Sequence, residues 1–284
     1  MTGTWRVFRA ELYRLLRTRI AHFAALFLVL VPVLHVTVAR YLDAAQRIDA
    51  ARRGRELLGL DEGLGWAPLV EAWRVGLALG ALLLLIHGAR TLAGDRERGI
   101  LRLASTRTST RASLVFGRAL VGPLLVLAVA ALTGLGAWLS AGVWFDFGPL
   151  VEDGYTILEP EELRGELIRA LASSVLALWA VHAFGLLVSA VARGATLAVA
   201  CAIALFLAFD LFKRALGDLG HWIFATYSPS FIDGSAMEEM AGMAHGYSDA
   251  GYPEELLRMS FVLPVPQALL MLVLAAAVMR RKRL

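Results

Sequence analysis

The chain has 284 residues, of which 58% are hydrophobic, and its mean hydropathy is +0.64. Its apolar residues gather in runs of about 20, the length that crosses the hydrocarbon core of a bilayer, so a soluble fold is not expected. The net charge is only +4, and the single cysteine, Cys201, rules out an intrachain disulfide. The composition predicts an all-α polytopic membrane protein in which residues 1–284 form a single transmembrane domain.

The first 19 residues predict a helix that lies on the membrane surface. Apolar side chains recur there at helical spacing, and arginines fill much of the remaining surface. The apolar set is Trp5, Phe8, Leu12, Leu15 and Leu16, and the arginines are Arg6, Arg9, Arg14 and Arg17. We interpret residues 1–19 as an amphipathic interfacial helix, and the alternative is an extension of the first span.

Six apolar stretches follow, each long enough to form a transmembrane helix. They cover residues 20–41, 67–86, 114–141, 167–192, 195–212 and 261–279. Seventeen of the 28 basic residues lie on the side that holds both termini, in residues 1–19 and 87–118, at Arg193 and in the tail after residue 279. Because arginine and lysine favour the cytoplasmic side of short loops, we expect both termini to be cytoplasmic, in the inner (cytoplasmic) membrane.

Residues 143–166 and 213–260 are then the extracytoplasmic segments, and both are rich in acidic residues. The second contains the sequence MEEMAGMAH, with Met237, Met240, Met243 and His245. Thioether and imidazole ligands suit Cu(I), but methionine at a spacing of three residues equally gives the apolar face of a short helix. We favour the short helix and expect no bound metal.

The segment between the second and third spans, residues 89–118, gives the main indication of function in the sequence. It reads ARTLAGDRERGILRLASTRTSTRASLVFGR. A membrane protein that is moved by a separate ATPase needs a short polar element on the cytoplasmic side for that motor to hold. Ile100, Leu101, Leu103 and Ala104 would seat a short helix against the bundle, and Asp95, Arg96, Glu97, Arg98 and Arg102 would face outward. The alternative is an ordinary positive-inside loop with an amphipathic turn.

This segment resembles the cytoplasmic loop of type-2 ABC exporter permeases. In that family an acidic-Arg-Glu-x-Gly-x-Leu stretch precedes a small polar turn, an arginine and a Gly-Lys pair that opens the next span. The matching residues are Asp95, Arg96, Glu97, Gly99, Leu101, Arg111 and Gly117, whereas Thr108 replaces the usual proline and Arg118 the usual lysine. The order of an amphipathic helix, six spans and a tight turn between the fourth and fifth spans also fits. Within the family, the chain most resembles NosY-like permeases, which work with the nitrous oxide reductase maturation machinery.

The resemblance implies the partners and the function. Two permease subunits, identical or different, would pair through their spans among the membrane lipids, and each would bind a nucleotide-binding subunit. Because the chain contains no G-x-x-x-x-G-K-[ST] stretch, ATP and Mg²⁺ are expected on that partner, with no cofactor or catalytic residue on this chain. We therefore expect the membrane-spanning permease subunit of an ABC exporter, with no nucleic-acid partner.

Two other functions stay open. A force-transmitting subunit of an ABC complex would use the same cytoplasmic segment to act on an extracytoplasmic partner protein, for example in the maturation of a metalloenzyme. A secondary transporter driven by an ion gradient would need ion-binding residues near the middle of the membrane, where these spans offer little beyond His182.

Several residues within the spans have both a structural and a functional interpretation. Gly76 and Gly80 form a G-x-x-x-G pair that lets a neighbouring helix approach closely, within the chain or at a subunit interface. Glu71 and Arg74 have the spacing of an i,i+3 ion pair near one end of the same span. His182 is a candidate for the lining of a translocation path, and a hydrogen-bonded core histidine is the alternative.

Overall fold

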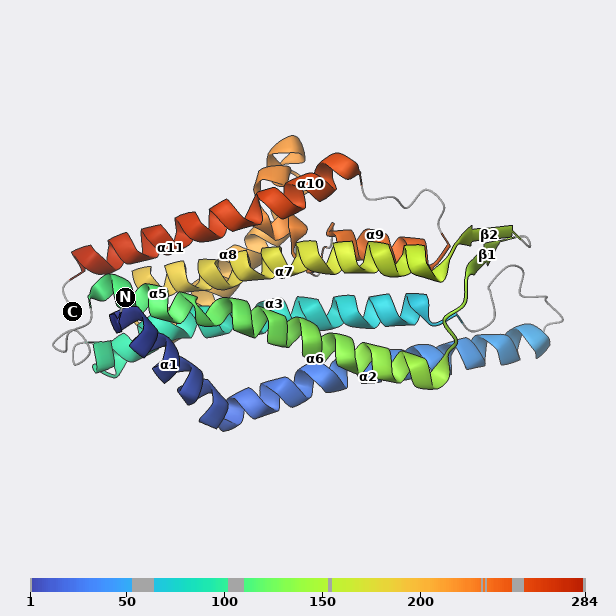
Figure 1. Cartoon of the computed structure of the whole chain (residues 1–284), viewed down its shortest axis with the longest axis horizontal. Coiled ribbons are helices and arrows are strands. Elements are labelled where there is room, and N and C mark those ends of the chain that lie inside the picture. Colours follow the sequence, from blue (N-terminus) through green and yellow to red (C-terminus); the bar gives the residue numbers. More distant parts are fainter. Residues whose placement is uncertain are drawn as a thin grey trace.

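The computed structural model describes residues 2–52, 64–101, 110–152, 155–230, 232, 234–246 and 253–282. Most of them are helical, as Figure 1 shows. The helices are α1 (Thr2–Arg17), α2 (Arg19–Arg52), α3 (Trp66–Glu97), α5 (Arg111–Ala119), α6 (Val121–Trp144), α7 (Pro160–Val191), α8 (Ala195–Phe212), α9 (Ala236–Ala244), α10 (Glu254–Val262) and α11 (Pro264–Arg281). Two short 3-10 helices, η1 (Gly217–Trp222) and η2 (Phe224–Tyr227), follow α8, and β1 (Leu150–Glu152) pairs with β2 (Tyr155–Leu158) in an antiparallel hairpin.

Within the described ranges, six helices are long and apolar enough to cross a membrane. They cover Arg19–Ala45, Trp66–Glu97, Arg111–Trp144, Pro160–Val191, Ala195–Phe212 and Glu254–Arg281. The third of them joins α5 to α6, and the sixth joins α10 to α11. Each overlaps one of the six predicted stretches, so the predicted all-α polytopic membrane fold is confirmed.

The helices α3 and α7 form the centre of the bundle. Half of the most apolar stretch of α3 and 72% of that of α7 are buried, against 17% for α2 and 22% for α8. The helices α2 and α6 pack on α3, α11 packs on α7, and α8 contacts both central helices (Figure 1). The two central helices have 32 residues each, or about 48 Å at the α-helical rise, and so extend beyond a hydrocarbon core of about 30 Å.

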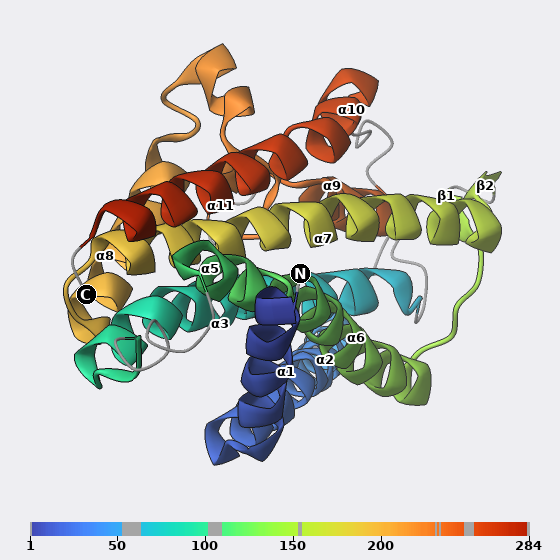
Figure 2. The same cartoon turned by 60° about the vertical axis from the view of Figure 1, so that its left-hand side comes forward.

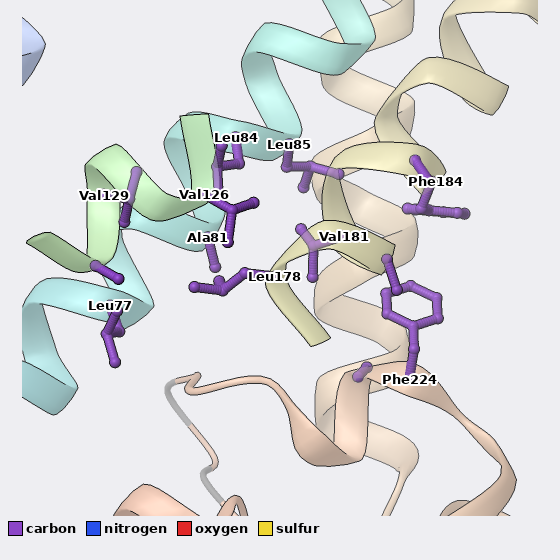
Figure 3. Packing of buried hydrophobic residues seen from close by; sticks show 14 of the residues in the cluster. Leu77, Ala81, Leu84, Leu85, Val126, Val129, Leu178, Val181, Phe184 and Phe224 are labelled. Carbon is purple, nitrogen blue, oxygen red and sulfur yellow. The ribbon is translucent and has the colours of Figure 1, made fainter. Parts of the chain in front are cut away.

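Small residues and close helix contacts define the core between these elements. Figure 3 shows side chains of α3 and α7 packed against α6, and its labelled residues include Leu77, Ala81 and Leu85 of α3, Val126 and Val129 of α6, and Leu178 and Val181 of α7. A Cβ atom at Gly88 would lie 2.7 Å from the carbonyl oxygen of His182, and one at Gly185 would lie 2.6 Å from that of Leu85. The backbones of α3 and α7 therefore touch, which only glycine permits at these two positions.

Both termini lie at the same end of the bundle (Figure 1), and we call this end the basic end. The opposite end, where β1 and β2 lie, is the hairpin end. At the basic end, α1 and α2 are separate helices that meet at Thr18, and Figure 1 shows the bend between them, so α1 does not continue the first span as a cytoplasmic extension. The carbonyl oxygen of Arg14 accepts the hydroxyl proton of Thr18 at 2.6 Å where the chain turns.

A buried ion pair lies where α8 ends. Asp210 and Lys213 are 2% and 4% exposed, and their charged atoms lie 2.8 Å apart. Ser230, which follows η2 in the chain, donates its hydroxyl proton to Asp210 at 2.6 Å and accepts from Lys213 at 3.1 Å. The pair therefore ties the segment after α8 back onto that helix, and hydrogen bonds of this kind offset the cost of burying two charges.

Candidate functional site

Three consecutive charged residues in the last turn of α3 reach three different parts of the bundle. Because an α-helix turns about 100° per residue, adjacent side chains leave its axis in different directions. Asp95 points to α1 and α5, Arg96 to the end of α7, and Glu97 to the start of α8. Arg96 also donates to Sδ of Met279 in α11 at 3.2 Å, so this helix end is connected to five other helices at the basic end.

Asp95 is the buried member of the three. It is 3% exposed, so the prediction that it faces outward is wrong. Its carboxylate accepts hydrogen bonds from Arg14 of α1, at 3.0 Å, and from Arg118 of α5, which is itself only 6% exposed. These two arginines lie on α1 and α5, which are distant in sequence but adjacent in the fold. Their positive charges compensate the buried carboxylate of Asp95. Charge-assisted hydrogen bonds of this kind are stronger than neutral ones.

Glu11 of α1 completes what we call the charge cluster, which consists of Glu11, Arg14, Asp95 and Arg118. Glu11 is 5% exposed and accepts a hydrogen bond from Arg14 at 2.7 Å, and its second carboxylate oxygen lies 3.9 Å from Nε of Arg118. Burial lowers the pKa of the Arg14 guanidinium, but the charges of Glu11 and Asp95 outweigh burial and leave that pKa above its usual value. With two acids and two bases, the charge cluster is electrically balanced.

Arg96 and Glu97 bind the tight turn between α7 and α8. Arg96 donates to the carbonyl oxygens of Ala190, at 3.2 Å, and Ala192, and Lys282 donates to that of Val191. Glu97 accepts the backbone N–H of Ala195 at 3.1 Å. The end of α7 thus receives cations and the start of α8 a carboxylate, which is the arrangement that the two helix dipoles favour.

The chain leaves α3 through an exposed turn, which we define as residues 97–100. Gly99 has a φ of +72°, and its N–H donates to the carbonyl of Arg96 at 3.0 Å. Only glycine adopts this left-handed backbone at a helix end without strain. Residues 97–100 are all exposed, whereas Leu101 is 1% exposed and anchors the chain again. The predicted roles of Arg102, Leu103, Ala104 and Thr108 lie outside the described residues.

The second half of the predicted coupling segment forms contacts within the chain. Arg111 donates to the carbonyl oxygen of Lys282 in the tail at 2.6 Å. A Cβ atom at Gly117 would lie 2.6 Å from Cβ of Val7, so the glycine lets α1 pack directly on α5 (Figure 2). Arg118 belongs to the charge cluster. Of the residues that resemble the family motif, most therefore hold the helices of the basic end together, and only Glu97 and Gly99 are exposed in α3 and the turn that follows it, beside Arg98.

The other candidate residues lie elsewhere in the bundle. His182 is 1% exposed, lies 3.3 Å through Nδ1 from the carbonyl oxygen of Leu84, and stacks on His87 with ring centroids 5.6 Å apart. This is the environment of a core histidine. Gly76 and Gly80 both lie where α3 packs on α6. A Cβ atom at Gly76 would be 2.8 Å from Cβ of Thr133, and a Cβ atom at Gly80 would overlap the side chain of Val129, and both of these neighbours belong to α6. Both glycines thus serve packing within the chain.

The ion pair of Glu71 is made with His245, at the end of α9, and not with Arg74. Nε2 of His245 lies 2.8 Å from the Glu71 carboxylate, which raises the pKa of His245. The other three candidate metal ligands lie on α9: Met237 and Met240 are 0% and 2% exposed in the core, and Met243 is half-buried. These methionines form the apolar face of a short helix. The partner of His245 lies 174 residues away in the sequence, so no local sequence pattern indicates it.

The six apolar spans in the described residues define a multi-pass α-helical membrane protein. The contacts that Asp95, Arg96 and Glu97 make at its basic end are called the junction below. The family model described as "ABC-2 family transporter protein" matches residues 5–233, and the chain belongs to this family. It is thus a membrane component of an ABC transporter, a class that is generally non-catalytic and works with an ABC ATPase. No curated protein matches the chain. The narrower resemblance to NosY-like permeases stays a prediction.

Proposed function

We propose that the chain is the membrane-spanning subunit of an ABC exporter and that a separate nucleotide-binding subunit drives it by hydrolysing ATP. The observation that carries this proposal is the family match over residues 5–233. The contacts at the basic end support it, because they connect one exposed turn to several helices and could transmit a movement of the ATPase to them.

The exposed turn, residues 97–100, is the surface that the ATPase would contact. Displacing it moves α3 directly. Arg96 and Glu97 pass the displacement to α7 and α8, and Asp95 passes it to α1 and α5. Since buried ion pairs and packed helices deform little, these elements would move together as a rigid unit.

The orientation is part of the same proposal. The basic end holds both termini, Arg193 and the described arginines of residues 87–118, and arginine-rich short segments favour the cytoplasmic side. We therefore place the basic end in the cytoplasm, where ATP is hydrolysed, and the hairpin end outside the inner membrane. The helices α2, α8 and α11 are the least buried spans and leave apolar faces for lipid and for a second permease subunit.

The buried charges support an ATPase-driven mechanism over transport driven by an ion gradient. A gradient-driven transporter needs carboxylates that exchange ions near the middle of the membrane. Among the described residues, the buried carboxylates are Glu11, Asp95 and Asp210, and each is paired with an arginine or lysine. Asp95 and Asp210 lie in the last turns of α3 and α8, and Glu11 lies in α1, outside the six spans, so none has the placement or the freedom that ion exchange requires.

The test is purification of the tagged chain from its own cells in a mild detergent. We expect co-purification of a protein that carries a G-x-x-x-x-G-K-[ST] ATPase motif. Arg98→Glu, in the exposed turn, should weaken this association, whereas Arg9→Glu, an exposed arginine of α1, should leave it unchanged. A chain that purifies alone and moves its solute without ATP would refute the proposal.

A further inference from the structure

A cavity of about 370 Å³ lies between α7, α9 and α10, toward the hairpin end of the bundle. The views in Figures 1 and 2 agree in placing α9 and α10 beside the same part of α7. Cavities that hold small organic ligands have volumes of about 300–1,000 Å³. The cavity is large enough for a small organic molecule, and it lies apart from the junction at the basic end.

The charged side chains of this cavity do not balance. Arg169 and Glu166 of α7 pair with each other at 3.0 Å. Glu239 of α9 and Glu254 of α10 also line the cavity, and neither has a cationic partner within ion-pair distance among the described residues. Burial, and then the neighbouring charge of Glu238, raise the pKa of the Glu239 carboxyl. Two carboxylates therefore face the cavity without a compensating cation from the described part of the chain.

The rest of the lining is apolar and comes from methionine and aliphatic side chains. Met240 is 2% exposed and Met243 is half-buried, and Leu257 of α10 lines the same cavity. Methionine is flexible and polarisable, so it adapts to ligands of irregular shape. A lining that combines two carboxylates with apolar side chains matches a molecule that has a positive charge at one end and an apolar body at the other.

We propose that this cavity is a binding site for a free amine with an apolar body, whose ammonium group pairs with Glu239 and Glu254. An ammonium group has three hydrogen-bond donors and can be shared by two carboxylates. A phospholipid with an amine headgroup fits less well, because its phosphate would add negative charge beside the two glutamates. A metal ion fits less well too, since no group of three His, Cys, Asp or Glu side chains in the described ranges is placed to hold one.

The test uses the chain alone, in nanodiscs of phosphatidylcholine, so its outcome does not depend on the ATPase of the proposed function. Three probes share one apolar body: phenylbutylammonium, phenylbutanol and phenylbutyrate. Binding is measured by ligand-observed NMR against empty nanodiscs. We expect saturable binding of the ammonium compound and none of the alcohol or the carboxylate.

Variants locate the site. The double variant Glu239→Gln and Glu254→Gln should weaken binding of the ammonium probe by about tenfold or more, because the ammonium group loses both of its charged acceptors. Glu238→Gln is the matched control, since Glu238 lies on the same helix, pairs with Arg214 at 4.0 Å and does not line the cavity. It should bind the ammonium probe as the unaltered chain does.

A second variant guards against a change in folding. Met243→Trp fills the cavity without altering its charge, and Met243 is only half-buried, so the chain should unfold at its usual temperature and lose the ammonium probe. The proposal is overturned if the three probes bind alike. It is equally overturned if the double glutamine variant or the tryptophan variant retains full affinity for phenylbutylammonium.

Discussion

Replacing Asp95 by asparagine tests whether the charge cluster holds the basic end together. The substitution keeps the size of the side chain and removes its negative charge. Arg118, which is 6% exposed, would then keep one ionic contact in the charge cluster, the longer one to Glu11 at 3.9 Å, beside a 3.5 Å hydrogen bond to the carbonyl oxygen of Leu114. Breaking a buried ion pair from one side costs about 3–5 kcal/mol. We expect about 3 kcal/mol here, the lower limit, because Glu11 still compensates part of the charge on Arg118.

Arg14→Gln provides the internal comparison, because it also removes one arm of the charge cluster. The Arg14 side chain is 43% exposed, so its contacts to Glu11 and Asp95 are screened by water. An ion pair with this exposure contributes about 1 kcal/mol or less. The structure thus predicts that Asp95→Asn is clearly more destabilising than Arg14→Gln, although both remove a charge from the same cluster.

The assay is the free energy of unfolding, measured by titrating the chain with sodium dodecyl sulfate in mixed micelles. A double variant, Asp95→Asn with Arg118→Met, should regain most of the stability that Asp95→Asn loses, because no buried charge is left unpaired. Equal and small effects of Asp95→Asn and Arg14→Gln would refute the buried position of Asp95. So would a double variant that loses the sum of the two single effects.

Two further predictions concern helix packing and pH. Gly80→Ala should destabilise the chain by about 1–3 kcal/mol in the same unfolding assay, because its Cβ would overlap Val129 of α6. Gly94→Ala in the same helix should be neutral or stabilising, because its Cβ would lie 3.8 Å from that of Ala195, an ordinary van der Waals contact. The bond to Glu71 raises the pKa of His245, so its stabilising contribution is complete below the ordinary histidine pKa of about 6.5 and is lost as pH rises through the higher folded-state pKa. Hydrogen exchange of α9, corrected for intrinsic rates, should therefore accelerate as pH rises above the ordinary histidine pKa of about 6.5, and His245→Gln should abolish this acceleration. An unchanged pH response in that variant would contradict the assignment.

The spans were predictable from sequence because one physical requirement, a run of about 20 apolar residues, fixes them. The same holds for α1 and for α9, whose apolar faces repeat at helical spacing. The burial of Asp95, in contrast, was not predictable from local sequence. Its helix and its charge were evident, but its burial depends on Arg14 and Arg118, which the fold alone brings together.

Partners from distant segments explain the other differences as well. Glu71 has a basic residue three positions away, yet it pairs with His245 from a different part of the chain. Asp210 and Lys213 have the ordinary spacing of a surface ion pair, and only the packing of Ser230 and the residues around it makes them buried. The β-hairpin was not predicted either, because its strands have only three and four residues. Local pattern thus predicts elements, whereas tertiary packing decides which charges meet.

The central claim is that the exposed turn at the basic end is where a partner ATPase drives this chain. Its most direct test is a photo-crosslinking amino acid introduced in living cells at Ile100, which is 42% exposed in that turn, and for comparison at Trp144, which is 48% exposed at the end of α6. We predict that the probe at Ile100 forms a covalent adduct with a protein that carries a G-x-x-x-x-G-K-[ST] ATPase domain and that the probe at Trp144 does not. An ATPase adduct at Trp144, or none at Ile100, would contradict the account.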